Sequence, residues 1–275
     1  MQARLCHLGL LAPPVDGDLG PVSHWAWRTF SGLHSVSDTT CLITALARVL
    51  LADSEDDLFP LDTGGHNLAS RIVRSLRIQV FRMARHPTST NIVQVKGHDP
   101  DGEPNANPTA RYIDLRFVAA ARDGRPVLLD TCPATKQPGW HYILKPLDGT
   151  NDPVKAAAQI LIGRYMAGCV GEHGGSAPQE ALVQRDRMRV HRDGQRRGVP
   201  EFERADYGIN QQHGSNSGCK YSAGSMVATQ VNGHREFMAI VNRNALPGKS
   251  QLQVCDHSAG SRAVRSLIAL TRFRS

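Results

Sequence analysis

The sequence predicts an α+β protein in which a small helical bundle precedes a β-rich domain. Apolar residues recur at helical spacing in two segments of the first 85 residues. Beyond Pro87 the apolar segments become short and rich in β-branched residues, and clusters of turn-forming residues separate them. The chain has 275 residues, which is enough for one large domain or for a catalytic domain with a small appendage.

The two predicted helices of the N-terminal region are amphipathic. The first covers Cys41–Ala52, and the second covers Asn67–Met83 after the break at Gly64 and Gly65. Their apolar positions fall on one helix face: Leu42, Ala45, Leu46, Val49 and Leu50 in the first, and Leu68, Ile72, Val73, Leu76 and Val80 in the second. Such helices, separated by glycine and proline turns, predict a small bundle over residues 1–85.

The central region, residues 86–245, is predicted to be mainly β-sheet. Its first three strands are expected at 91–96, 112–121 and 126–130. Residues 152–168 fit either a helix that Asp152 and Pro153 would cap or a strand in the run ILIGRYMAGCV. Periodicity alone does not decide between these two alternatives.

The end of the chain divides into a predicted helix and an unassigned segment. Phe237, Ile240 and Val241 are spaced as neighbours on one helix face, so residues 233–241 are expected to be helical. Residues 246–275 receive no secondary structure and are treated as a C-terminal extension.

Composition and charge narrow the class of partner. The formal net charge is +7 and the pI is about 9.3, which favours contact with polyanions such as nucleic acid or an anionic cell envelope. The densest basic group, residues 185–197, is interleaved with acidic residues, and aromatic residues that could stack on bases are few. A dedicated nucleic-acid surface is therefore not expected.

Targeting signals are not found. The chain has no run of 18 apolar residues, and its N-terminus lacks the uninterrupted apolar region of a signal peptide. We expect the protein to be made in the cytoplasm without a standard secretion signal. If its substrate lies outside the membrane, it would act in the periplasm or cell wall after export or lysis.

No metal or cofactor site is expected. The six cysteines are scattered without a CxxC pair, which favours reduced thiols over a disulfide scaffold or a zinc site. Four histidines could in principle gather around zinc, but none has the spacing of a known metal motif: His173, His191, His213 and His234.

The strongest chemical pattern lies in YGINQQHGSNSGCKYSAGSMVA, residues 207–228. His213 is followed by Gly214, and eleven residues after Gly214 the small-residue turn SAGS ends at Ser225. An acyl-transfer nucleophile needs a base within reach and backbone N–H groups aimed at the developing oxyanion, and small residues permit that approach. The alternative is a polar glycine and serine loop with an incidental histidine.

This stretch resembles the catalytic motif of the L,D-transpeptidase (YkuD-type) family, a His-Gly pair followed by Ser-His-Gly-Cys. Upstream, residues 135–143 (TKQPGWHYI) resemble the T-x-x-P-G-x-x-x-I element of that family. A branch of phage-borne and bacterial proteins with this domain is more similar still. Its motifs EALVQ, V-x-RD, GINQHHG, SAGC and GHREFM correspond here to residues 180–184, 190–193, 208–214, 222–225 and 233–238.

The resemblance implies a role for each matching residue. The residue at 225 would be the nucleophile and His213 its base, with oxyanion donors from the backbone of Gly224 and Ser225. Ser222, in the same turn, is also counted among the catalytic residues. Substrate binding is implied for four further residues: Asn210, Gly214, Arg192 and His234. For Arg192, which precedes Asp193, the alternative is an ordinary surface ion pair.

Three positions depart from the family. Ala223 replaces a histidine, as it does in the closer branch, and Gln212 stands where that branch often has histidine. Ser225 occupies the place of the nucleophilic cysteine, and a hydroxyl has a far higher pKa than a thiol. Three explanations remain open: an engineered inactive variant, a true serine nucleophile activated by His213, or a natural pseudoenzyme. Cys219, six residues after His213, matches no nucleophile position of the family.

A second resemblance lies near the N-terminus. Residues 15–23 (VDGDLGPVS) are similar to the core of the helical repeat of the peptidoglycan-binding domain-1 family. The alternative is a plain turn before an amphipathic helix that carries Trp25, Trp27 and Phe30.

Together these resemblances imply an enzyme that acts on peptidoglycan by acyl transfer and cuts stem-peptide or cross-link amides, as a phage endolysin or a secreted toxin would. Cross-linking or exchange of stem peptides is an alternative, and so is a wall-binding protein without catalysis. Peptidoglycan is the expected partner, together with an immunity or delivery protein. A nucleic-acid-binding protein is a weaker rival.

Overall fold

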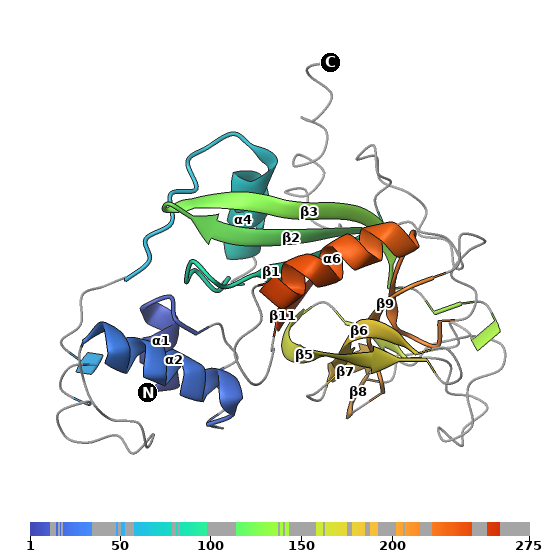
Figure 1. Cartoon of the computed structure of the whole chain (residues 1–275), viewed down its shortest axis with the longest axis horizontal. Coiled ribbons are helices and arrows are strands. Elements are labelled where there is room, and N and C mark those ends of the chain that lie inside the picture. Colours follow the sequence, from blue (N-terminus) through green and yellow to red (C-terminus); the bar gives the residue numbers. More distant parts are fainter. Residues whose placement is uncertain are drawn as a thin grey trace.

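The structure, a computed structural model, describes much of the chain. The described residues are 1–11, 15, 17, 19–34, 48, 51–52, 58–78, 81, 83–97, 114–136, 138–139, 141–142, 158–161, 163–174, 178–184, 188–191, 202–205, 207–214, 222–243 and 252–258. They form an α+β fold with N-terminal helices, a β-barrel and a C-terminal helix (Figure 1). The predicted fold class is confirmed at this level.

The first two helices pack against each other. α1 (Gln2–His7) and α2 (Pro21–Leu33) share an apolar core around Leu5, Trp27 and Phe30. Gly20 caps α2 and Pro21 stands at its first turn, where the missing N–H of proline costs no helical hydrogen bond. The predicted aromatic helix after the Gly20–Pro21 turn is therefore confirmed.

α4 (Leu68–Ile78) corrects the prediction of a helical bundle over residues 1–85. The helix lies within the predicted range and begins after Asn67, whose side chain accepts a hydrogen bond from the Ser70 N–H at 2.8 Å. Its apolar face packs on the barrel, where Ile72 and Leu76 contact a cluster that includes Phe117. Periodicity shows that a helix has an apolar face but not which element that face covers. The predicted helix at 41–52 lies largely outside the described residues.

The predicted strands after Pro87 form the first part of the barrel. β1 (Asn91–Lys96), β2 (Asp114–Arg122) and β3 (Arg125–Thr135) pair in antiparallel order. Asp123 and Gly124 both have positive φ, 49° and 69°, as a two-residue type I′ hairpin requires. β3 continues five residues beyond the predicted end at 130, through a stretch that includes Pro133.

The rest of the barrel comes from strands that are far apart in the sequence. They are β5 (Gly163–His173), β6 (Gln179–Gln184), β9 (Gln211–His213), β10 (Met226–Ala228) and β11 (Leu252–Ser258). The closed order is β1-β11-β5-β6-β9-β10-β3-β2. A separate sheet has the order β4-β7-β8, from β4 (Gln159–Ile160), β7 (Met188–His191) and β8 (Phe202–Ala205).

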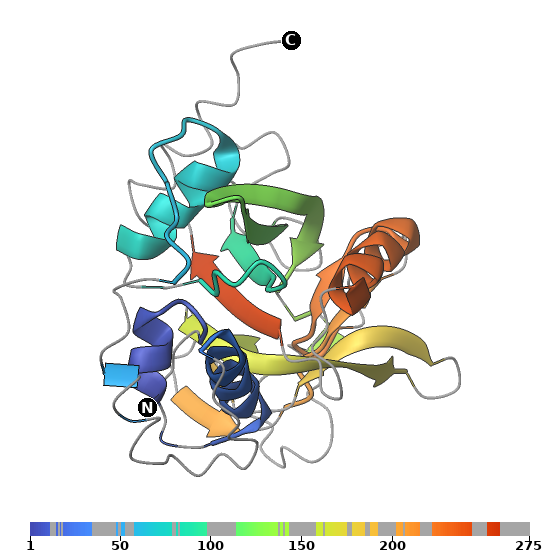
Figure 2. The same ribbon diagram turned by 60° about the vertical axis from the view of Figure 1, so that its left-hand side comes forward.

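β5 and β11 settle two questions that the sequence left open. The run ILIGRYMAGCV contributes to strand β5, so the strand alternative holds over residues 163–168. β11 lies in the segment predicted as a C-terminal extension, yet it pairs in parallel with β1 and antiparallel with β5 (Figure 2). The predicted boundary at residue 245 is therefore not a boundary of the barrel.

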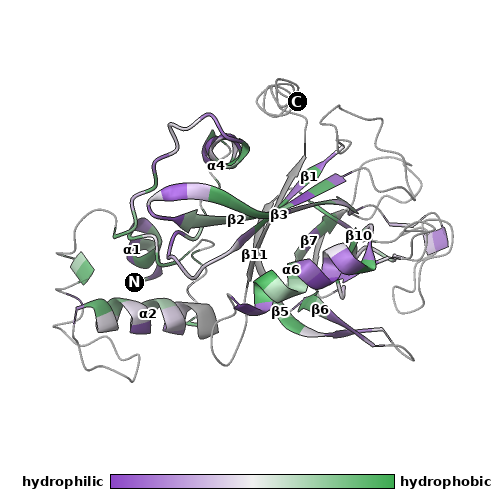
Figure 3. Ribbon diagram, turned by 45° about the horizontal axis from the view of Figure 1, so that its top comes forward, coloured by the Kyte–Doolittle hydropathy of each residue, from purple (hydrophilic) through white to green (hydrophobic). Residues whose placement is uncertain are grey.

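α6 (Val231–Arg243) contains the predicted 233–241 helix and covers one side of the barrel. Its inward residues Phe237 and Val241 pack with Ile92, Val118 and Leu182 from three barrel strands. Arg235 and Glu236 on the opposite side of the helix are exposed, and Figure 3 shows apolar and hydrophilic residues on the same helix. Among the described helices, none is long and apolar enough to cross a bilayer.

Candidate active site

The turn that contains position 225 is closed by Ser222. The Ser222 hydroxyl donates to the backbone oxygen of Ser225 at 2.8 Å and accepts a hydrogen bond from the Gly224 N–H at 3.3 Å. The backbone oxygen of Ser222 accepts from the Gly139 N–H at 2.7 Å, which ties the turn to the TKQPG segment. Ser222 is buried, so its role here is to hold the turn in shape.

Gly224 has a conformation and a setting that only glycine suits. Its φ is +136°, and a Cβ at this position would lie 2.4 Å from the backbone oxygen of Ala158. L-residues rarely adopt this φ, and the contact is far inside van der Waals distance. The backbone at position 224 can therefore pass close to the segment that leads into β4.

The Ser225 hydroxyl contacts the backbone at the start of β9. It donates to the backbone oxygen of Gly208 at 3.3 Å and accepts from the Asn210 N–H at 3.4 Å. Both hydrogen bonds are long, and the side chain is 7% exposed. Ser225 is thus largely buried, and its hydroxyl is only weakly held.

The Asn210 side chain, beside Ser225, links the segment before β9 to β5 and β6. Its side-chain oxygen accepts from the Gln184 N–H at 2.8 Å, so its NH₂ group faces Nδ1 of His173, also at 2.8 Å. An NH₂ group only donates, and Nδ1 of His173 must therefore be unprotonated. Burial lowers the pKa of His173, in agreement with a neutral ring. The sequence predicted that Asn210 binds substrate. In the structure its side-chain oxygen and nitrogen both already have hydrogen-bond partners within the protein.

His213, at the end of β9, has a ring orientation that suits a base. Its Nδ1 lies 3.1 Å from the backbone oxygen of Gly214. A carbonyl only accepts, so Nδ1 carries the hydrogen and Nε2 of the neutral ring keeps its lone pair. The Gly214 N–H continues the β9–β10 ladder through a 3.0 Å hydrogen bond to the Ala228 oxygen. His213 is half-buried and therefore reachable from solvent.

The register of β9 and β10 separates His213 from Ser225. These parallel strands pair Met226 with Gln211 and Ala228 with His213. Ser225 therefore lies beside Asn210, three positions before the level of His213. At about 3.3 Å per residue the offset is roughly 10 Å along the strands. In the described part of the chain the Ser225 hydroxyl bonds to the 208–210 backbone and not to His213.

His234, on α6, lies against His213 but is itself buried. The two ring centroids are 5.6 Å apart in an edge-to-face arrangement, and His234 is only 2% exposed. Nε2 of His234 lies 2.8 Å from the Glu180 backbone oxygen and must donate to it. Burial, opposed in part by this hydrogen bond, lowers the pKa of His234 to about 4. The sequence predicted that His234 binds substrate, but in this structure almost none of the residue is exposed for such a contact.

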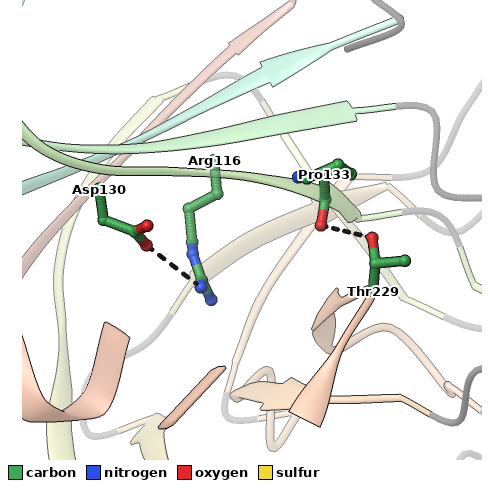
Figure 4. A network of polar contacts seen from close by, with 4 residues as sticks. All are labelled: Arg116, Asp130, Pro133 and Thr229. Atoms are coloured by element: carbon green, nitrogen blue, oxygen red, sulfur yellow. Dashed lines mark hydrogen bonds and ion pairs between the residues drawn. The ribbon is translucent and has the colours of Figure 1, made fainter. Parts of the chain in front are cut away.

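Arg116, on β2, is a buried residue near this site that sequence reasoning did not single out. Its guanidinium stacks over the Phe237 ring, 3.7 Å from the centroid, and Nη2 lies 3.7 Å from Oδ2 of Asp130 on β3 (Figure 4). Burial lowers the pKa of Arg116 and raises the pKa of Asp130, although each group opposes the shift of the other. A charged residue inside the apolar segment that predicted a strand, residues 112–121, was the signal that could have indicated it.

The remaining predictions concern Arg192 and metal binding. Arg192 lies outside the described residues. In the part of the chain that the structure describes, no three His, Cys, Asp or Glu side chains gather as metal ligands.

No family model, curated protein or solved structure matches this chain. Its function must therefore be argued from the motifs and from the geometry of the turn, His213 and their neighbours.

Proposed function

We propose that the protein is a peptidoglycan-active enzyme of L,D-transpeptidase type that hydrolyses amide bonds of stem peptides or cross-links. The observation that carries the proposal is the Ser222–Ser225 turn. Gly224 of this turn packs directly against the Ala158 oxygen. The turn places residue 225 just before β10, beside the strand that ends in His213. The family motif places its nucleophile in such a turn.

The proposed chemistry uses three groups. The side chain at 225 attacks the carbonyl carbon of a diaminopimelate amide, and Nε2 of His213 takes its proton. The carbonyl oxygen, now negative, accepts hydrogen bonds from the Gly224 and Ser225 N–H groups. The amide C–N bond then breaks, and the amine leaves with the proton from His213. Water releases the acyl group in hydrolysis, whereas an amine would release it in cross-linking or exchange.

This mechanism requires movement from the arrangement in the structure. His213 is offset from Ser225 by three register positions, and the Gly224 N–H is occupied by the Ser222 hydroxyl at 3.3 Å. An offset of roughly 10 Å along the strands is too large to be closed by the shortening of one hydrogen bond, so residues 222–225 must be displaced together. We therefore propose that the substrate displaces the weak bonds of the Ser225 hydroxyl and draws the turn toward His213.

A wall-binding protein without catalysis is the second candidate. It is favoured by the Ser225 hydroxyl, which donates to the Gly208 oxygen and hydrogen-bonds to no basic side chain among the described residues. A serine hydroxyl that is not activated by a neighbouring base is a poor nucleophile. On this reading the turn would hold a stem peptide without cutting it.

The N-terminal helices supply the proposed attachment to the wall. Residues 15–23 are similar to the peptidoglycan-binding repeat, and α2 follows directly after them. Val15 and Leu19, in the described part of this segment, are exposed apolar residues. Exposed apolar side chains on a chain with a net charge of +7 suit a carbohydrate polymer that carries anionic groups.

The first test restores the cysteine of the family motif. We expect Ser225→Cys to release new muropeptides from purified sacculi and the double variant Ser225→Cys/His213→Gln to release far fewer. If Ser225→Cys releases none but the protein still sediments with sacculi, the binding candidate replaces the enzyme. Retention on heparin with no retention on sacculi would instead favour a nucleic-acid-binding protein.

A further inference from the structure

We propose that His234 is a positioning residue for His213: its ring, presented by α6, keeps Nδ1 of His213 on the Gly214 oxygen and Nε2 free to act as the base. The inference deepens the proposed function, because it takes His213 as the base of the reaction. It differs from the substrate-binding role that the sequence motif implies for His234.

The contact between the two rings carries the inference. Their centroids are 5.6 Å apart and their planes meet at 65°, so the rings meet edge to face. Among the residues that the structure describes, the His213 side chain hydrogen-bonds to the Gly214 oxygen alone, at 3.1 Å, and a single bond of this kind leaves the ring free to turn. The His234 ring, packed against the His213 ring, restricts that rotation.

His234 is itself held from two sides. Nε2 donates to the Glu180 backbone oxygen on β6 at 2.8 Å, and the ring of Phe237 lies 5.8 Å away on the same helix face. His234 and Phe237 are three residues apart, so they are neighbours along one side of α6. The ring that touches His213 is therefore fixed to a barrel strand and to its own helix.

A second set of contacts fixes α6 to β2 and β3. Phe237 lies under the Arg116 guanidinium of β2, which in turn faces Asp130 of β3. Near the start of the helix, the Thr229 hydroxyl donates to the Pro133 oxygen at 2.7 Å (Figure 4). Contacts to β2, β3 and β6 together leave the helix little freedom to shift His234 away from His213.

Burial, more than the surrounding charges, keeps the His234 ring neutral while it performs this role. It is faced by Arg116 from β2, His213 from β9 and Glu180 from β6, and Asp130 of β3 partly balances Arg116. Burial is the main reason for the low pKa of His234, about 4, with smaller contributions from Arg116 and His213. A neutral His234 does not repel the proton that His213 must accept during attack.

Two substitutions distinguish the effect of the His234 ring from the effect of its hydrogen bond to Glu180. His234→Phe keeps an aromatic wall but loses the hydrogen bond to Glu180, whereas His234→Gln keeps a donor for that bond but loses the ring. Arg235→Ala is the matched control, because Arg235 is the exposed neighbour of His234 on the same helix. Circular dichroism and thermal unfolding establish which variants are folded.

The readout is the imidazole ¹⁵N spectrum of His213 at neutral pH, which reports its tautomer without any need for activity. We expect the Nδ1–H form to dominate in the unsubstituted protein, in His234→Phe and in Arg235→Ala, and a mixture of tautomers in His234→Gln. In the Ser225→Cys background, His234→Gln should lose about 10- to 100-fold in kcat, with the pH profile of kcat displaced, because a base out of place costs about that much. His234→Phe should restore most of this loss.

Identical His213 spectra in His234→Gln and Arg235→Ala would overturn the inference. If the His234 variants do not fold, the unsubstituted protein decides: a mixed His213 tautomer, or no ring-to-ring nuclear Overhauser effect between His213 and His234, would equally overturn it. An inactive Ser225→Cys protein in which the His213 tautomer still responds to His234→Gln would remove the proposed function and leave the positioning contact in place.

Discussion

At the scale of single residues, the turn before β10 depends on Gly224, and the proposed base, His213, lies against His234, with both histidines in defined tautomers. The tautomers follow from carbonyl partners, since the Gly214 and Glu180 oxygens can only accept. The sequence could predict the residue types in the turn from its motif. It could not predict that His213 and Ser225 lie at different levels, because the parallel register of β9 and β10 is set by tertiary packing.

Replacement of Gly224 should be costly, whereas replacement of Gly233 should not. Gly224→Ala would place a Cβ 2.4 Å from the Ala158 oxygen at a φ of +136°, so we expect a loss of at least about 2 kcal/mol in the free energy of unfolding. Gly233→Ala, in α6 with no heavy atom within 4 Å of the added Cβ, should gain about 0.5–1 kcal/mol. Urea unfolding measures both, and equal effects would contradict the close approach at Gly224.

The low pKa of His234 predicts how stability depends on pH. The unfolded chain protonates this histidine near pH 6.5 and the folded chain near pH 4, so the unfolded state binds more protons between these values. Stability should therefore rise with pH over this window, by up to about 1.4 kcal/mol per pH unit from this group. The slope should be shallower in His234→Phe. The free energy of unfolding of the unsubstituted protein and of His234→Phe is measured by denaturation from pH 4 to pH 7. If the two proteins show the same dependence on pH, His234 is not a buried neutral group.

At the scale of elements, α6 is the part that joins the candidate site to the barrel. Its helical spacing was predicted correctly from Phe237, Ile240 and Val241. Its polar anchors were not predicted, because a sequence pattern does not show that Arg116 faces Phe237 from a strand 121 positions earlier. For the same reason α4 was assigned to the wrong partner: its pattern is equally compatible with a helical bundle and with a sheet.

The Arg116–Asp130 pair should show the behaviour of buried charges. Arg116→Met leaves Asp130 without its cation, and we expect a loss of about 3 kcal/mol in the free energy of unfolding. The double variant Arg116→Met/Asp130→Asn should recover a large part of it, since it removes both charges. Arg125→Met, at an exposed position of β3, is the control and should change stability by less than about 0.5 kcal/mol. A double variant no more stable than Arg116→Met would contradict the pairing.

At the scale of the whole molecule, the barrel is closed by β11, which comes from the far end of the chain. It pairs with β1 in parallel and with β5 in antiparallel order, and these partners lie about 160 and 90 positions earlier in the sequence. Long-range pairing of this kind leaves no local pattern, so the sequence could not assign it. Periodicity did locate β1, β2 and β3. These strands follow one another in the sequence and pair with their sequence neighbours, and a two-residue turn joins β2 to β3.

Removal of β11 should open the barrel. A chain truncated after Arg243 would expose the edges of β1 and β5, and we expect it to aggregate or to unfold at a clearly lower urea concentration. A chain truncated after residue 260 keeps β11 and serves as the control. Size-exclusion chromatography with urea unfolding compares the two. Equal stability and equal monomer content would mean that the barrel does not need this strand.

The central claim, acyl transfer at position 225, is tested most directly by the intact mass of the protein after incubation with a diaminopimelate-containing stem tetrapeptide. The account predicts that Ser225→Cys gains the mass of the acyl portion of the peptide, without the leaving amine. It also predicts that Ser225→Cys/His213→Gln gains little of this mass in the same time. An unchanged mass of Ser225→Cys, in a protein that is folded and binds the peptide, would contradict the claim.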